Sequence, residues 1–297
     1  MSLIYYNAYL LAGTMSDRIG TVDRWATKLG VRPVAARMYW LWRDARDALR
    51  EFRYRQYRLR NDTYRVTVGD ARADFHVLSR QEYLDLVRLP ERPILADLLS
   101  ELRRDDVFYD LGSNIGLYSC LVASVVEPTV VAFEPHPKNA ERLAQNRSLN
   151  ESALSLQRVA IAASSGTAQM RLSPGFDIDT VGSAGHTLLT EYYDEDSGVI
   201  STEKRRGDEF VAEAEHPPPT VLKIDTEGTE MDVLQGFDST LARPECRLVY
   251  CEVHEDRLRS QGHSVSDIRA FLESHGFSAE KRSVADCPPF VRAEKPG

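Results

Sequence analysis

From about residue 94 onward, the chain alternates short, mainly apolar runs with segments whose apolar residues recur at helical spacing. Such alternation predicts an α/β fold, in which helices cover both faces of a mostly parallel sheet and ligands bind at the carboxyl ends of the strands. The last two runs are expected to form an antiparallel edge pair. The predicted strands span residues 107–111, 129–133, 156–161, 221–224, 248–252, 277–282 and 290–293. The helices predicted between them span residues 117–126, 139–146, 230–234 and 265–275.

The preceding part of the chain follows a different pattern. Residues 34–52 have one apolar face and one arginine-rich face, which predicts an amphipathic helix. Tyr64–Val68 and Asp74–Leu78 alternate as the strands of a hairpin with its turn at Gly69-Asp70, and a helix is expected over 94–102. We therefore divide the chain into an N-terminal helical and hairpin extension, residues 1–93, and a catalytic domain, residues 94–297.

One segment of the predicted domain does not follow the alternation of strands and helices. Residues 173–204 are rich in Gly, Ser, Thr, Asp and Tyr and show little periodicity. Long irregular segments within compact domains are often functional, so we interpret this one as an inserted loop that contributes to substrate binding.

Charge is distributed unevenly along the chain. The whole molecule has a formal net charge of -8, which argues against a general binder of polyanions, but residues 32–60 hold nine arginines and only three acidic residues. The favoured interpretation is that this arm docks on the acidic domain or on a second subunit of a homodimer. A peripheral contact with an anionic membrane ranks second, and binding of nucleic acid ranks last.

Neither the cysteines nor the N-terminus indicates export. The four cysteines form no C-x-x-C pair and have no zinc-ligand spacing, so we expect reduced thiols in a cytoplasmic protein, with a peripheral position at the inner membrane surface as the alternative that the basic arm would allow. The apolar patch at residues 3–12 lacks a basic lead-in and is shorter than a membrane span. We therefore expect neither a signal peptide nor a transmembrane helix.

A glycine-rich turn follows the first strand of the repeating part. Gly112 and Gly116 suit close approach of the backbone to a nucleotide-like ligand. Asn114 stands where a dinucleotide fold requires glycine, and Asp110 would repel a pyrophosphate. The ammonium and sulfonium of S-adenosylmethionine would instead be attracted by this carboxylate. The turn therefore favours S-adenosylmethionine over NAD.

A second acid supports the same cofactor. Glu134 ends the next predicted strand, where a carboxylate can accept hydrogen bonds from both ribose hydroxyls. Taken alone, Asp110 could simply cap a helix and Glu134 could be a solvated strand end. Together with the turn, the two acids favour a cofactor site.

Three blocks of sequence, residues 107–119, 131–150 and 222–236, resemble the FkbM-type methyltransferases. The resemblance implies a Rossmann-like class I methyltransferase fold and transfer of a methyl group from S-adenosylmethionine to a hydroxyl of a saccharide, glycolipid or polyketide. One departure is Arg206-Gly207-Asp208, where the family often has Leu-Asp before the fourth strand. The resemblance assigns cofactor contacts to Asp110, Gly112, Ser113, Asn114, Gly116, Glu134, Pro135, Ala160 and Asp225.

Candidate catalytic groups follow the fourth and fifth strands of the repeating part. They are Asp225, Glu227, Glu230, Glu252 and His254. His254 is our first choice for the general base because imidazole titrates near neutral pH, although a lone histidine at a strand end can also be merely structural. Asp225, Glu227, Glu252 and His254 could instead hold a divalent cation, but their spacing does not require one and we assign no metal. Lys223 is expected to pair with Asp225 on the same face of its strand.

The acceptor is expected to be a hydroxyl. Enzymes that methylate amino groups of nucleobases commonly carry an Asn/Asp-Pro-Pro-aromatic block after the fourth strand, where this chain has Asp225-Thr226-Glu227-Gly228. The alternatives are an RNA-directed methyltransferase that uses the arginine-rich arm and a noncatalytic module that binds a membrane or a partner.

Overall fold

The computed structural model describes residues 32–296 apart from 126–128, 175–178, 180, 183–184, 190, 194–196 and 214. Two units are distinguished, one containing residues 32–64 and 76–89 and the other containing residues 65–75 and 90–296. Most of the hairpin thus belongs to the larger unit, whereas the sequence had suggested placing all of it in the extension. The apolar patch at residues 3–12 lies outside the described residues.

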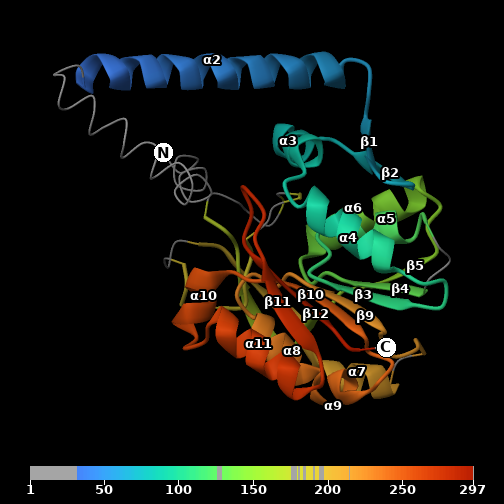
Figure 1. Ribbon diagram of the computed structural model, residues 1–297. Helices are drawn as coiled ribbons and strands as arrows, with labels where there is room; N and C mark the ends of the chain where they lie inside the picture. Colours follow the sequence, from blue (N-terminus) through green and yellow to red (C-terminus); the bar gives the residue numbers. More distant parts are fainter. Residues whose placement is uncertain are drawn as a thin grey trace. The chain divides into compact units, whose positions relative to one another are not determined.

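The larger unit is built on a seven-stranded sheet with the order β11-β12-β10-β9-β3-β4-β5 (Figure 1). β12 pairs antiparallel with both β10 and β11, and the other neighbouring strands pair in parallel, so the predicted mostly parallel sheet is confirmed. The predicted antiparallel pair is β11 and β12, although only β11 forms the edge because β12 also pairs with β10. The strands are β3 (Val107–Leu111), β4 (Thr129–Phe133), β5 (Leu154–Gln157), β9 (Val221–Ile224), β10 (Leu248–Glu252), β11 (Ser278–Arg282) and β12 (Phe290–Glu294).

Helices cover both faces of this sheet. In Figure 1, α4, α5 and α6 lie on one face, and α7, α8, α9 and α11 lie on the other. The central strands β3, β9 and β10 are buried along their whole length, which explains why they are almost continuously apolar in sequence. The helices of this unit are α4 (Arg92–Glu101), α5 (Leu117–Val122), α6 (Pro137–Leu149), α7 (Gly207–Glu213), α8 (Glu230–Gly236), α9 (Asp238–Ala242), α10 (Glu255–Ser260) and α11 (Val265–Ser274).

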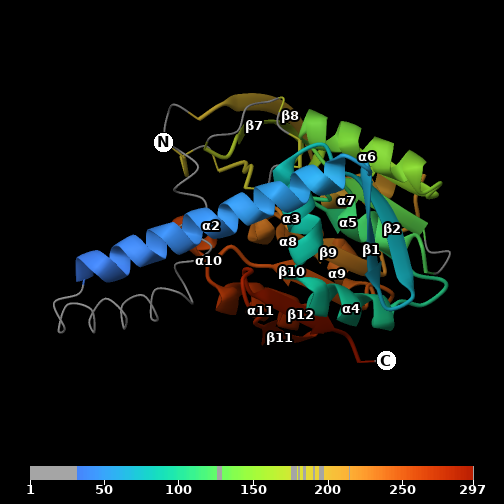
Figure 2. The same cartoon turned by 90° about the horizontal axis from the view of Figure 1, so that it is seen from above.

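A second, three-stranded sheet corrects two sequence predictions. Its strands β6 (Ala160–Ala162), β7 (Gly166–Arg171) and β8 (Val199–Arg206) have the order β6-β8-β7, and β7 and β8 run side by side in Figure 2. The single strand predicted over 156–161 was wrong, because β5 ends at Gln157 and β6 joins the other sheet. The loop predicted over 173–204 was too long, because residues 199–204 belong to β8 and pair with β7. The pairing of β7 with β8 cannot be predicted from a short stretch of sequence, because the insertion separates the two strands in the chain.

The sequence departure at Arg206-Gly207-Asp208 has a structural role. The helix α7 begins at Gly207, and a Cβ atom there would come within 2.7 Å of the Phe237 ring. The carboxylate of Asp208 accepts hydrogen bonds from the backbone N–H groups of Ser239 and Thr240. This turn therefore anchors α9 to the strand β8.

The smaller unit contains the helices α2 (Arg32–Arg58) and α3 (Arg80–Arg88). The amphipathic helix predicted over 34–52 is confirmed as part of α2, whereas α3 was not predicted. Ser79 and Glu82 close α3 with a capping box. The hairpin is formed by β1 (Thr63–Val68) and β2 (Ala71–His76), with the predicted turn at Gly69-Asp70. In the described part of the chain, no helix has the length and apolar composition needed to cross a membrane.

Candidate active site

The chain order of the large sheet reverses at β3, and the ends of β3, β4, β9 and β10 meet at that point. Ligands of open α/β sheets bind in the crevice at such a reversal. The glycine turn follows β3, Glu134 follows β4, Asp225 follows β9 and His254 follows β10. The glycine turn and these three residues, which are far apart in sequence, are thus brought together at the carboxyl ends of the parallel strands.

The glycine turn is fixed by its contact with the end of β9. Gly112 has φ +77°, and a Cβ atom built on it would lie 1.8 Å from the backbone carbonyl oxygen of Asp225. Asn114 also adopts a left-handed conformation, with φ +49°, and Gly116 has φ +88°. Glycine at position 112 is therefore required by packing as well as by backbone conformation.

Glu134 is held against the glycine turn by two backbone hydrogen bonds. Its Oε2 accepts from the Asn114 N–H at 2.8 Å, and its Oε1 accepts from the His136 N–H at 2.8 Å. Burial raises the pKa of Glu134 to about 7, although these two hydrogen bonds favour the charged form. Each oxygen retains a second lone pair with which it can accept a hydrogen bond from a ligand.

Asp110 lies behind the turn. Its side chain is buried, and its Oδ2 accepts hydrogen bonds from the backbone N–H and hydroxyl of Ser119 in α5. The ammonium of Lys223 lies 3.7 Å from Oδ1 of Asp110 and 3.1 Å from Oδ2 of Asp225. The predicted pair between Lys223 and Asp225 is thus confirmed, and the same lysine also faces Asp110. Burial raises the pKa of Asp110, and Lys223 opposes that increase.

A pocket of roughly 690 Å³, partly open to solvent, lies in front of the turn. Its charged lining residues are Glu134, Asp225 and Glu227, and no lysine or arginine is among the described lining residues. His186 also lines it, and burial lowers the pKa of this imidazole to about 3, so it is neutral. Apolar side chains complete the lining: Leu111, Phe133, Val159, Ile161, Met170 and Leu188. The pocket therefore suits a cation with an apolar portion and disfavours a phosphate.

The predicted cofactor residues divide into two groups. The pocket is lined by Gly112, Asn114, Glu134, Pro135, Ala160 and Asp225. Asp110, Ser113 and Gly116 are not among its lining residues. Ser113 donates its hydroxyl to the carbonyl of Phe133, and a Cβ on Gly116 would come within 2.9 Å of Leu143. These three residues support the conformation of the glycine turn on the side away from the pocket. Their contact with a ligand stays a prediction.

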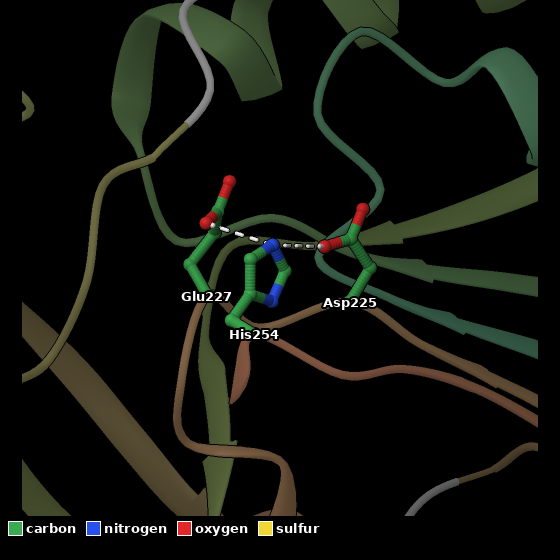
Figure 3. A group of neighbouring side chains, drawn as sticks. All are labelled: Asp225, Glu227 and His254. Carbon is green, nitrogen blue, oxygen red and sulfur yellow. Dashed lines mark ion pairs between the residues drawn. The ribbon is translucent and has the colours of Figure 1, made fainter. Parts of the chain in front are cut away.

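Beside the pocket, Asp225, Glu227 and His254 point toward one another (Figure 3). Nε2 of His254 lies 3.0 Å from Oε2 of Glu227 and 4.0 Å from Oδ1 of Asp225. On the other side of the ring, Nδ1 lies 2.8 Å from Oε1 of Glu230, a residue that is fully buried. Three predicted candidates are thus brought together, and Glu230 orients the imidazole from behind.

The carboxylates around His254 determine its charge. Burial opposes protonation of the imidazole, but Glu227 and Glu230 outweigh this effect and raise the pKa of His254 to about 10. Glu252, the remaining predicted catalytic residue, is also buried. Burial and the nearby Asp225 raise the pKa of Glu252 well above its usual range. With a pKa of about 10, His254 carries a positive charge at neutral pH, and the raised pKa of Glu252 favours the protonated form of that acid.

Several site residues were missed by the sequence reasoning. Arg257 in α10 binds the carboxylate of Glu227 and the hydroxyl of Tyr193, while the Gly185 N–H donates to Oε1 of Glu227 at 2.7 Å. His186 lies in the same insertion and stacks on His136 with a centroid distance of 4.6 Å. The insertion thus supplies part of the wall. Its composition indicated a functional segment, but no local pattern indicated which residues face inward.

Residues 110–279 match the family model described as the methyltransferase FkbM domain. The chain belongs to the FkbM methyltransferase family. This match covers more than half of the chain and includes the glycine turn, the pocket and the cluster around His254. The matched segment is thus a methyltransferase domain with the Rossmann-like fold that the sequence predicts, and S-adenosylmethionine is the cofactor of this domain.

Two named relatives are similar to this chain over more than half of its length. The hexuronic acid methyltransferase AglP of Haloferax volcanii is 32% identical over 164 residues, which cover 55% of this chain and 62% of the relative. The 31-O-demethyl-FK506 methyltransferase FkbM of Streptomyces tacrolimicus is 29% identical over 201 residues, covering 60% of this chain and 75% of that protein. The chain therefore spans less than two thirds of the length of the first relative.

A crystal structure of a methyltransferase FkbM from Methylobacillus flagellatus KT is also similar. It has a TM-score of 0.46 and 15% sequence identity, and the likeness covers 65% of this chain and 45% of that chain.

Proposed function

We propose that this FkbM-family protein transfers the methyl group of S-adenosylmethionine to a hydroxyl of a saccharide, a glycolipid or a related small molecule. The supporting observation is a pocket whose charged lining is entirely acidic in the described residues and which adjoins the cluster around His254. The acids suit a cationic cofactor, while the cluster can bind a hydroxyl and take its proton. The cytoplasmic location is part of this proposal.

The proposal places the cofactor along the pocket. Asn114 and Gly112 would face the methionine portion, with Asp110 acting through the field of its carboxylate from behind the turn. Glu134 and the adjoining Pro135 would hold the ribose, because the free lone pairs of the carboxylate can accept from two hydroxyls. Ala160 and the apolar residues around it would enclose the adenine.

Methyl transfer needs an acceptor oxygen in line with the methyl group and the departing sulfur of S-adenosylmethionine. Asp225 and Glu227 line the pocket where they can position a hydroxyl. We assign removal of its proton to His254, whose Nδ1 is engaged by Glu230 so that Nε2 faces the pocket side of the cluster. A cationic cofactor beside Asp225 would lower the pKa of His254 toward the range useful for a base.

The acceptor class is supported by chemistry and by relatives. The names of the two relatives refer to a hexuronic acid and to a demethylated hydroxyl position of a natural product. The acidic lining of the pocket is unfavourable for the phosphates of RNA. A small polyhydroxylated acceptor therefore ranks above a nucleic acid.

The proposal is tested by a transfer assay with methyl-labelled S-adenosylmethionine over sugars, sugar acids, lipid-linked glycans and RNA. Labelled product is expected with a saccharide acceptor and should disappear when its hydroxyls are blocked. Calorimetric titration with S-adenosylmethionine should show one site per chain. Labelling of RNA alone, or transfer to amines in place of hydroxyls, would overturn the proposal.

A membrane partner for α2 is a separate part of the proposal. Trp42, Leu49 and Phe52 are exposed at helical spacing, and arginines are interleaved with them. Such a face suits an anionic bilayer. Sedimentation with vesicles should show binding that requires anionic lipid and is lost in a W42A/F52A variant. Equal binding to neutral vesicles, or unchanged binding by the variant, would contradict it.

A further inference from the structure

We propose that Asp225, Glu227 and His254 form a binding site for one divalent cation of the Mn²⁺ type. Each residue contributes one ligand atom, and the three atoms lie within 4.8 Å of one another. A mixture of two carboxylates and one imidazole suits a cation that accepts both oxygen and nitrogen ligands. The inference rests on the proposed function and assigns a ligand to the same site.

The separations agree with a shared cation. Two ligands about 2.1 Å from one metal ion are about 3.0 Å apart when adjacent and about 4.2 Å apart when opposite. Nε2 of His254 is 3.0 Å from Oε2 of Glu227 and 4.0 Å from Oδ1 of Asp225. Figure 3 shows the imidazole nitrogen of His254 between the carboxylates of Asp225 and Glu227, so the three ligand atoms face one another.

Each ligand residue is held by neighbouring groups. Oδ2 of Asp225 accepts from Lys223, which leaves Oδ1 on the side of His254. Oε1 of Glu227 accepts from the Gly185 N–H, and Arg257 donates to Oε2 of Glu227, the same oxygen that faces the imidazole. Nδ1 of His254 is bound by Glu230, as the second nitrogen of a metal-binding histidine commonly is by a carboxylate. The side chains are therefore preoriented toward a common point.

The local charge also favours a cation. The acids Asp225, Glu227, Glu230 and Glu252 surround His254, whereas Lys223 and Arg257 are the permanent cations that contact them. One oxygen of the fully buried Glu230, Oε2, has no hydrogen-bond partner among the described residues. With His254 bound as a neutral ligand, the ionised Asp225, Glu227 and Glu230 would outnumber Lys223 and Arg257, and a divalent cation would offset the remaining negative charge.

Such a cation would connect the cluster to methyl transfer. Asp225 and Glu227 line the pocket, so an open coordination position could take the acceptor hydroxyl. The cation would favour the ionised oxygen, with the proton passing to water, and His254 would then act as a ligand rather than as the base.

The test is a Mn²⁺ titration of the full chain after treatment with EDTA, followed by the electron paramagnetic resonance signal of free Mn²⁺. We expect one bound ion per chain, at least tenfold weaker binding by E227Q and by H254Q, and competition by Mg²⁺ or Zn²⁺. H275Q is the matched control, because His275 pairs with Asp238 at 3.1 Å but belongs to no three-ligand group among the residues that the structure describes. Thermal unfolding shows whether each variant is folded. If H254Q does not fold, E227Q alone tests the metal site.

Absence of Mn²⁺ binding at millimolar concentration would overturn the inference, as would binding that both variants retain. These outcomes differ from failure of the proposed function. Methyl transfer that is indifferent to EDTA and occurs without Mn²⁺ binding would contradict the metal site alone. Mn²⁺ binding that the variants lose, in a protein that methylates no hydroxyl, would support the site and reject the proposed reaction.

Discussion

The α-carbon of Gly112 lies so close to the end of β9 that a side chain there would meet the backbone carbonyl oxygen of Asp225 at 1.8 Å. This contact joins the cofactor turn to the strand end that carries Asp225. Since Asp225 also belongs to the cluster with His254, the cofactor pocket and the proposed acceptor site share one rigid junction.

A Gly112→Ala substitution should therefore destabilise the protein and weaken cofactor binding. The left-handed conformation alone costs an alanine about 1–2 kcal/mol, and the backbone clash should add about 2 kcal/mol or more. Gly262→Ala is the matched control, because Gly262 has φ +78° and no atom within 4 Å of its built Cβ. Chemical denaturation and calorimetry with S-adenosylmethionine measure both effects. Equal destabilisation by the two substitutions would contradict the role of the contact.

Glu134 should make cofactor affinity dependent on pH. Its pKa is raised to about 7 by burial, so the free protein increasingly carries the protonated acid as the pH falls below that value. Ribose hydroxyls donate best to the carboxylate, and affinity should therefore decrease below pH 7, by at most about tenfold per unit. Titrations between pH 5.5 and pH 8.5 measure this slope.

The variant Glu134→Gln should bind more weakly at pH 8 and lose most of that pH dependence. Glu141→Gln is the control, because Glu141 lies on the same loop-and-helix segment but forms an exposed pair with Lys138. A pH slope that persists in Glu134→Gln would assign the effect to another group.

Removal of the His254 imidazole should lower turnover without affecting cofactor binding. Whether it accepts the proton or binds a cation, the residue acts on the acceptor side, so His254→Ala should decrease kcat by about 10²–10⁴-fold. The affinity for S-adenosylmethionine should change less than threefold, and His275→Ala should match the parent in both measurements. Unchanged turnover in His254→Ala would reject the assignment.

Lys223 should be important for stability because it is the buried cation between Asp110 and Asp225. Its replacement by methionine leaves the buried Asp110 and the half-buried Asp225 without their counter-charge and should cost about 3–5 kcal/mol of unfolding free energy at pH 8. Lys138→Met removes a lysine from an exposed pair and should cost at most about 1 kcal/mol. Similar unfolding midpoints for the two variants in urea would contradict this view of Lys223.

The elements that repeat locally could be predicted from the sequence. The strands β3, β4, β9 and β10 are almost entirely buried and are therefore mostly apolar, which marks them in the chain. The boundary between β5 and β6 could not be read in this way. Apolar residues flank it on both sides, with only Gln157 and Arg158 between them, and only pairing with different partners assigns the two segments to different sheets.

The same division holds for the site. By itself, the sequence determined the glycine turn, the acid after β4 and the candidate acids and histidine after β9 and β10. These features could be recognised because backbone requirements and side-chain chemistry depend on residues that are close together in the sequence. Only the tertiary structure decided that Glu230 binds Nδ1 of His254, that Arg257 holds Glu227 and that His186 reaches the pocket. Glu230 and His254 are 24 positions apart in the chain, and Glu227 and Arg257 are 30 positions apart. No local pattern predicts such contacts, because the residues are brought together only when the helices and the insertion pack on the sheet.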